Sequence, residues 1–185
     1  SHLETNQEAG DVGALVAFND ALNNATSDEL RSVLASFTDV DYFSRYMAVD
    51  DAIANFDGIT TYYSTATGDG AGNHNFFFYQ ESANKFTIIP WDLESTLSTS
   101  YFGSVPYWQT IPADCTQTYK VWGGENQVIA PGCDRVFQAL AVDTTTYRAA
   151  AQQLLEGPFA EARVSADIDS IAALIGDAAR ADPNG

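Results

Sequence analysis

K-F-T-I-I-P-W-D-L-E, from Lys85 to Glu94, is the segment from which the rest of the fold can be worked out. Its apolar residues at 86–89 predict a short strand, because aromatic and β-branched side chains suit a half-buried pleated surface. Pro90 lacks a backbone donor and ends the ladder, so Asp92 follows directly beyond the strand. An acidic side chain at such a rim is well placed to bind a metal ion or to act as a catalytic acid. It can also cap the next turn, and this stretch alone favours the capping role.

A second strand precedes this one and is expected to pair with it. Residues 73–79 read N-H-N-F-F-F-Y, and the polar residues at 81–84 supply a turn, so the two strands form a β-hairpin. Asn75 enters this hairpin and Asp92 leaves it. We therefore expect both side chains to lie at the same end of the hairpin. His74 is more often a surface or packing residue than a ligand.

Helices account for most of the remaining chain, because apolar residues recur at helical spacing on both sides of the hairpin. A capping-box pattern at Thr26–Glu29 marks the start of one of them. Residues 60–64 are expected to be a strand or an extended link. The fold class is therefore α+β and mostly helical. The expected helices cover 11–24, 30–37, 39 to about 55, 136–142, 144–155 and the segment from Ser165 onward.

Asp57 is a second candidate for a functional side chain. It lies where the third helix runs out, in A-N-F-D-G, and Gly58 is suited to the left-handed conformation that closes a helix. A carboxylate near a helix C-terminus is slightly unfavourable because the helix dipole is negative there. Residues placed against local preference often serve a function, although a solvated aspartate in a turn is common.

Composition limits the classes of partner. The chain of 185 residues has a net charge of −17 and only eight basic residues, with Lys85 and Lys120 as its lysines. Nucleic acid and anionic membrane surfaces are excluded as partners, because both require a basic surface. No apolar run is long enough for membrane insertion.

The two cysteines lie in a segment rich in turns and aromatic residues. Residues 100–133 are expected to form an ordered irregular loop or a small subdomain inserted in the domain. Cys115 and Cys133 are too few for a usual zinc site, so they form either a disulfide closing this loop or two buried free thiols. A disulfide indicates an oxidising compartment.

Three pieces of the sequence together resemble one family. They are Y-M-A-V-D-D-A-I-A-N-F-D-G (46–58), H-N-F-F-F-Y (74–79) and F-T-I-I-P-W-D-L-E (86–94). In this order and spacing they resemble the spore-coat protein H (CotH) kinase family. Its members are secreted or lie on the spore surface, and they have an atypical protein-kinase fold. The similarity is strongest over residues 38–100.

The resemblance implies a role for each candidate residue. Asp57 matches an aspartate that orients or deprotonates the acceptor hydroxyl, and Asp92 matches the metal-binding aspartate of kinases. Asn75 matches a metal or phosphate contact, and Glu94 is a further metal ligand where many members have Asp. The implied function is transfer of a phosphoryl group from ATP, with Mg²⁺, Mn²⁺ or Ca²⁺, to Ser or Thr of a secreted or surface protein.

The resemblance also implies how the chain is organised and where it acts. Residues 1–185 match the C-terminal, catalytic-lobe part of a single kinase-like domain. The N-terminal half of the domain, which holds the nucleotide, is expected to be missing from this chain and to be its partner, so the fragment is expected to keep the catalytic geometry without full activity. The location implied is secreted, or on the cell or spore surface.

Two other readings of the same residues remain open. In one, the chain is a non-catalytic extracellular binding or adhesion module, whose acidic surface and aromatic loop bind Ca²⁺, a glycan or a protein, with Trp108 and Trp122 as candidate contacts. In the other, Asp57 and Asp92 are the two carboxyl groups of a glycosidase, and exposed aromatic residues stack against sugar.

Overall fold

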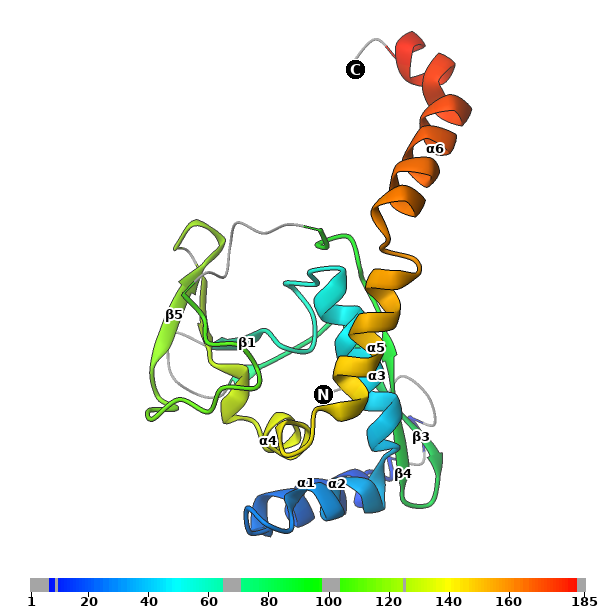
Figure 1. Ribbon diagram of the computed structural model, residues 1–185. Helices are drawn as coiled ribbons and strands as arrows, with labels where there is room; N and C mark the ends of the chain where they lie inside the picture. The colour runs from blue at the N-terminus through cyan, green and yellow to red at the C-terminus, as the bar shows by residue number, and fades with distance from the viewer. Residues whose placement is uncertain (1–6, 9, 65–70, 98–103, 125, 183–185) are drawn as a thin grey trace.

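The computed structural model describes residues 7–8, 10–64, 71–97, 104–124 and 126–182. Within these ranges the protein is α+β, with six α-helices and two small antiparallel sheets (Figure 1). The helices are α1 (Gly13–Asn24), α2 (Leu30–Phe37), α3 (Val40–Ala52), α4 (Arg135–Ala141), α5 (Thr145–Glu156) and α6 (Glu161–Ala181). The strands are β1 (Tyr62–Ser64), β2 (Ala71–Gly72), β3 (Phe76–Ser82), β4 (Lys85–Pro90), β5 (Thr118–Val121) and β6 (Asn126–Ile129). The short 3₁₀ segments η1 (Trp122–Gly124) and η2 (Pro131–Cys133) flank β6.

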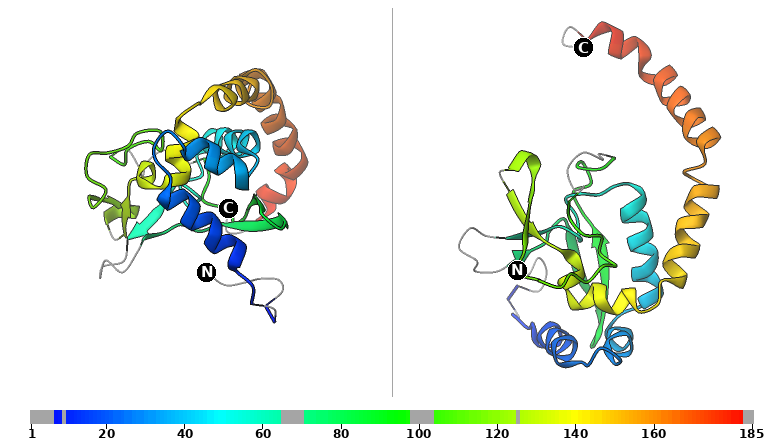
Figure 2. Two further views of the ribbon diagram at one scale, coloured as in Figure 1. Left: turned by 90° about the horizontal axis from the view of Figure 1, so that it is seen from below. Right: turned by 60° about the vertical axis from the view of Figure 1, so that its left-hand side comes forward.

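Helices α1 to α5 follow the predicted segments closely. The Asp39 side chain caps α3 by accepting a 2.9 Å hydrogen bond from the Tyr42 amide, and Asp134 caps α4 in the same way through Val136. In the expected capping box, the Glu29 carboxylate accepts hydrogen bonds from Thr26, and the regular helix then begins at Leu30. Helices α3 and α5 lie side by side (Figure 2).

The predicted hairpin is present as β3 and β4. Its register pairs Phe76 with Pro90 and Phe78 with Ile88, so β4 ends at the proline as expected. One face of the hairpin packs on the helices, where Phe86 and Ile88 are buried in the core. The other face carries the exposed side chains of Phe77, Tyr79, Ile89 and Trp91.

The hairpin is also tied to the helices through polar groups. The Lys85 ammonium donates to the carbonyl oxygen of Ala35 at 2.7 Å, and the Tyr42 hydroxyl donates to the Ile88 carbonyl at 2.8 Å. These contacts fix the hairpin against the α2–α3 junction. Lys85 therefore helps to hold the hairpin against the helices.

The second sheet has strand order β2-β1-β6-β5, and its strands β5 and β6 lie in the segment 100–133, for which an irregular loop or a small subdomain was expected. Within the described part of that segment, β5 and β6 pair with each other, and β6 pairs with β1 through Tyr62 and Ile129. These strands have only three or four residues each, so alternation along the sequence gave little signal.

The two cysteines form a disulfide, as the first of the two alternatives predicted. Cys115 and Cys133 are joined with a Cα–Cα distance of 5.7 Å, which links the segment before β5 to η2. Within the described ranges, none of the helices combines the length and the apolar character needed to cross a bilayer.

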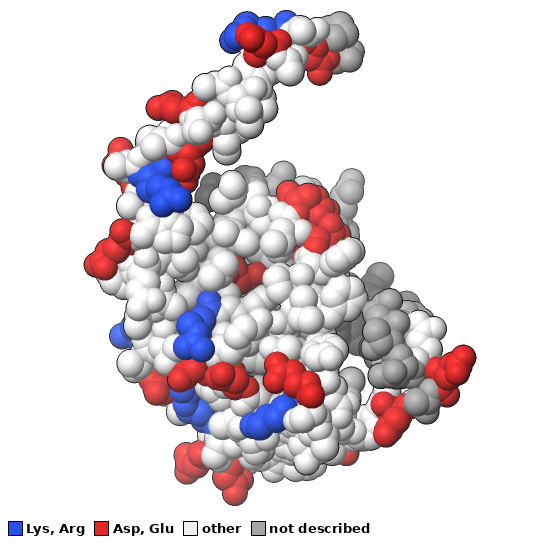
Figure 3. Space-filling view, turned by 90° about the vertical axis from the view of Figure 1, so that its right-hand side faces the viewer, with Lys and Arg blue, Asp and Glu red and all other residues white. Residues whose placement is uncertain are grey.

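Helix α6 begins at Glu161, four residues before the expected start, and extends away from the rest of the molecule (Figures 1 and 2). It has no buried residue. Figure 3 shows this projection from another side, together with acidic side chains scattered over the body among fewer basic ones. The apolar residues of α6 that stay exposed are Ile168, Ile171, Leu174 and Ile175.

Candidate functional site

The loop that carries Asp57 does not begin as the sequence predicted. Helix α3 ends at Ala52, and Ala54, with φ +48°, takes the left-handed conformation that was expected of Gly58. Gly58 has a different reason to be glycine. A Cβ there would lie 2.3 Å from the Asn55 amide nitrogen, so only hydrogen fits beneath that side chain. Asp57 therefore lies in a packed turn that begins beyond the end of the helix.

The Asp57 carboxylate is held by donors from several elements. Its Oδ1 accepts a 2.6 Å hydrogen bond from the Tyr63 hydroxyl, and His74 Nε2 lies 3.1 Å from the same oxygen. Its Oδ2 accepts from Asn75 Nδ2 at 3.1 Å, and that amide also donates to the Asp57 carbonyl at 2.8 Å. The side chain is 20% exposed, so it is oriented by the protein and still reachable from solvent.

Tyr63 belongs to a short chain of contacts behind Asp57. Its hydroxyl accepts a 2.5 Å hydrogen bond from Trp122 Nε1, and its ring stacks on His74 with centroids 5.1 Å apart. Burial raises the pKa of Tyr63, and the hydrogen bond to Asp57 raises it further, so the phenol stays protonated and acts as a donor. This arrangement fixes the direction of the carboxylate from β1 and η1.

Asp92 and Asn75 lie at the open end of the hairpin and share an unusual backbone conformation. The Trp91 amide donates to the Asn75 carbonyl at 2.9 Å, which brings the start of β3 against the residues after β4. Asn75 has φ +62° and Asp92 has φ +54°, both in the left-handed region. Two such non-glycine residues side by side are uncommon, and conformations of this kind cluster at functional sites.

Glu94 completes the group. Its carboxyl is hydrogen-bonded to Asp92, which raises the pKa of Glu94, and the charges of Asp92 and Asp57 raise it further. Both Asp92 and Glu94 are exposed. The structure therefore brings Asp57, Asn75, Asp92 and Glu94 together at one end of the hairpin, while their chemical roles stay predictions.

The oxygen atoms of this group are of the type that a hard divalent cation prefers. Within the described residues, no three His, Cys, Asp or Glu side chains are arranged to hold a metal ion. Mg²⁺ does not need such a cage, because it usually binds one or two carboxylates, keeps several waters and takes phosphate oxygens from the substrate. Asp92, Glu94 and the amide oxygen of Asn75 can supply ligands of this kind.

Sequence reasoning missed three residues of the site. His74 was set aside, although it lies directly before Asn75. Tyr63 carried no signal, and Trp122 was named only as a candidate surface contact, because the hydrogen bonds that bring them to Asp57 follow no local sequence pattern. Trp108, expected among the exposed aromatic residues, is 2% exposed and donates its indole N–H to Asp51 at 2.9 Å.

Comparison with known proteins gives one finding about family. A family model described as CotH kinase protein matches residues 2–185. No curated protein and no solved structure matches the chain. The family match agrees with the resemblance carried by the three sequence motifs.

Proposed function

The chain belongs to the CotH kinase protein family, and from this premise we propose that it serves in transfer of a phosphoryl group from ATP to Ser or Thr of a secreted or surface protein. The observation that carries the proposal is the convergence of Asp57, Asn75, Asp92 and Glu94 at the open end of the hairpin. Phosphoryl transfer depends mainly on positioning and on charge neutralisation, so it needs few protein groups, held in fixed directions. The proposed fold is correspondingly an atypical kinase-like catalytic lobe.

Asp57 is proposed to orient the acceptor hydroxyl and to take its proton. The donors around it support this role, because Tyr63 and Asn75 fix both carboxylate oxygens from opposite sides. A carboxylate whose direction is preset requires no rearrangement when the substrate arrives. Its remaining exposure leaves room for an incoming hydroxyl group.

Asp92, Glu94 and Asn75 are proposed to hold Mg²⁺. Bound there with ATP, the ion would neutralise charge on the phosphate groups. The support is electrostatic, since Asp92 and Glu94 lie within hydrogen-bonding reach of each other and Glu94 also feels the charge of Asp57. In the described part of the chain, none of the ion pairs joins Asp92 or Glu94 to a basic residue, so a cation would relieve their repulsion.

The test is the substitution Asp92→Asn, measured by calorimetric binding of Mg²⁺–ATP and by phosphate transfer to an acceptor protein. We expect both signals to fall by about 100-fold or more, because one charged ligand of the metal is lost. The melting temperature should stay level or rise, since Asp92 is exposed and asparagine tolerates its positive φ well. Asp28→Asn, an exposed change far from the hairpin in sequence, is the matched control and should alter neither signal.

Two outcomes would overturn the proposal. If Asp92→Asn unfolds the protein, Asp92 is a structural cap of the turn. If neither this chain nor a form of it extended at the N-terminus binds Mg²⁺–ATP, a non-catalytic surface-binding role becomes the better account. The exposed hairpin face formed by Phe77, Tyr79, Ile89 and Trp91 is the observation that favours this second role.

A further inference from the structure

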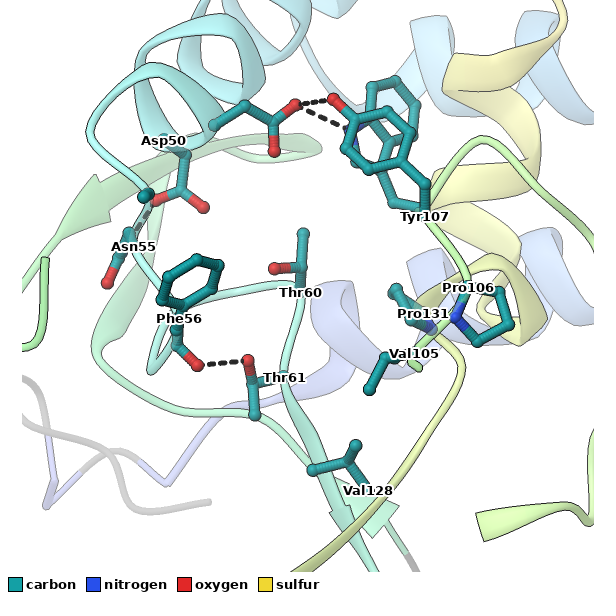
Figure 4. Close-up of a pocket in the computed structure, with 13 residues that line it drawn as sticks. Asp50, Asn55, Phe56, Thr60, Thr61, Val105, Pro106, Tyr107, Val128 and Pro131 are labelled. Atoms are coloured by element: carbon teal, nitrogen blue, oxygen red, sulfur yellow. Dashed lines mark hydrogen bonds between the residues drawn. The ribbon is translucent and has the colours of Figure 1, made fainter. Parts of the chain in front are cut away.

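A cavity lies on the other side of the loop that carries Asp57. It has a volume of about 450 Å³ and is enclosed by the end of α3, the loop at 54–61, the segment 105–108 and β6 (Figure 4). Its lining includes none of the four residues of the candidate site. Volumes of this order are typical of sites for small organic molecules.

Asp50 supplies a carboxyl group to this cavity that the protein only partly satisfies. The residue is 5% exposed, and one carboxyl oxygen accepts a 2.8 Å hydrogen bond from Asn55 Nδ2. Its other oxygen points toward the open centre of the cavity (Figure 4). Among the described residues, no Lys, Arg or His forms an ion pair with Asp50.

Asp50 differs from the neighbouring acidic residue in how well its oxygen atoms are hydrogen-bonded. Asp51 also lines the cavity, but its Oδ2 accepts hydrogen bonds from the side chains of Tyr107, Trp108 and Tyr147. Asn55 is 4% exposed, and its side-chain oxygen is buried without a hydrogen-bond partner. Buried polar atoms are nearly always paired, so Asp50 and Asn55 indicate a missing polar group in or beside the cavity.

The walls of the cavity favour a cation with an apolar body. Phe56, Tyr107 and Trp108 contribute aromatic rings, and Val105 and Pro106 contribute aliphatic surface. Neither Lys nor Arg is among the described lining residues, and the whole chain carries a net charge of −17. Aromatic faces attract ammonium groups, and a strongly acidic protein concentrates cations at its surface.

We propose that this cavity binds a small organic ammonium cation, whose charged group lies at Asp50 and whose apolar body lies between Phe56, Val105 and Tyr107. The site is separate from the proposed phosphoryl-transfer site and does not depend on that function. Its ligand would still contact the loop of residues 54–61, on which Asp57 lies. A primary or methylated amine attached to an aliphatic or aromatic group of modest size fits the chemistry.

The first experiment compares 2-phenylethylammonium with 2-phenylethanol, a neutral molecule of similar shape, by amide NMR titration of the full chain. The pH is set about one unit above the pKa of Asp50, which is about 7, so that the carboxylate is mostly ionised. We expect the ammonium compound to bind at least about 10-fold more tightly and to shift the amides of Phe56, Thr60 and Val105. The proposal would be overturned if the two compounds bound with equal affinity, if neither bound, or if the shifted amides lay elsewhere in the protein.

Two variants then separate the charge from the shape of the cavity. Asp50→Asn should weaken binding of the ammonium compound by about 10-fold and leave 2-phenylethanol unchanged, because only the charge is removed. Val105→Phe should abolish binding of both by filling the cavity, which keeps the test decisive if Asp50→Asn does not fold. Asp28→Asn is the control, because Asp28 is exposed and outside the cavity lining, and this variant should bind like wild type. If Asp50→Asn or Val105→Phe binds the ammonium compound as tightly as wild type does, the compound lies outside this cavity and the proposal is wrong.

Discussion

Asp50 shows how burial of one carboxyl group shapes the behaviour of the protein. Burial raises its pKa from an ordinary value of 3.8 to about 7, against the opposing effect of the hydrogen bond from Asn55. The folded state therefore keeps a proton on Asp50 at pH values where the unfolded chain has already lost it. Stability from this group is fully present below pH 3.8 and is lost as the pH rises through about 7.

This linkage leads to a prediction about Asp50→Asn. A shift of this size is worth on the order of 4 kcal/mol of unfolding free energy between acidic and alkaline pH. Urea unfolding at about pH 5 and about pH 8 should show wild type losing stability with rising pH, and the variant losing less by a few kcal/mol. If the two proteins lose stability equally, Asp50 is not the group that titrates.

Gly58 gives a second prediction at this scale. Its φ is not in the left-handed region, so close packing alone excludes a side chain. Gly58→Ala should lower the free energy of unfolding by about 1–3 kcal/mol, because the new methyl group displaces Asn55 from Asp50. Gly72→Ala is the matched control, since nothing lies within 4 Å of its added Cβ. Equal urea midpoints for the two variants would contradict this account.

Some residues of the candidate site could be predicted from the sequence, and others could not, because their contacts join segments that are far apart in the chain. Asp57, Asn75, Asp92 and Glu94 were predictable, because each follows or precedes a recognisable element and the motifs identify them together. The role of Tyr63 was not predictable, because no local sequence pattern indicates its hydrogen bonds with Asp57 and Trp122. Its contact with Trp122 spans 59 positions of sequence and forms only once β1 and β6 have paired.

The elements show the same division. Helices α1 to α5 and the hairpin were predicted well, since helical spacing and a strand–turn–strand pattern are local signals. The four-stranded sheet was missed, because β1 has three residues and one of its two partners, β6, lies more than 60 positions away in sequence. The end of α3 was misplaced because glycine is the usual left-handed residue, whereas Ala54 holds that conformation here.

The disulfide gives a prediction for the segment that carries β5 and β6. Cys115 and Cys133 are 18 positions apart. Closing a loop of this length lowers the conformational entropy of the unfolded chain, which stabilises the folded state by about 3 kcal/mol. Replacing both cysteines with serine should lower the free energy of unfolding by roughly that amount in chemical denaturation. Reductant should destabilise wild type and leave the double variant unchanged. If reductant affects both alike, the stabilisation does not come from the bond.

The whole molecule is dominated by its excess of acidic groups. The chain has 25 acidic and eight basic residues, and the described ion pairs between carboxylates and arginine involve only Arg31, Arg163 and Arg180. Most carboxylates therefore repel one another across the surface.

Screening of this repulsion is directly measurable. Raising NaCl from about 0.01 to about 0.5 M shortens the Debye length from about 30 Å to a few Å, so the melting temperature should rise by roughly 2–4 °C for each kcal/mol of repulsion relieved. The same amount of an uncharged osmolyte serves as the control for non-electrostatic effects. A melting temperature that does not respond to salt would show that the repulsion is not significant for stability.

The projecting helix α6 has a consequence for how the molecule diffuses and scatters. A compact chain of 185 residues has a radius of gyration of about 16 Å, whereas the 21 residues of α6 alone extend about 31 Å along their axis. Mass placed so far from the centre raises the radius of gyration by several Å and slows tumbling in an anisotropic manner. Small-angle X-ray scattering should therefore show a pair-distance distribution with a long tail, and amide NMR relaxation should give α6 a different effective correlation time from that of the body.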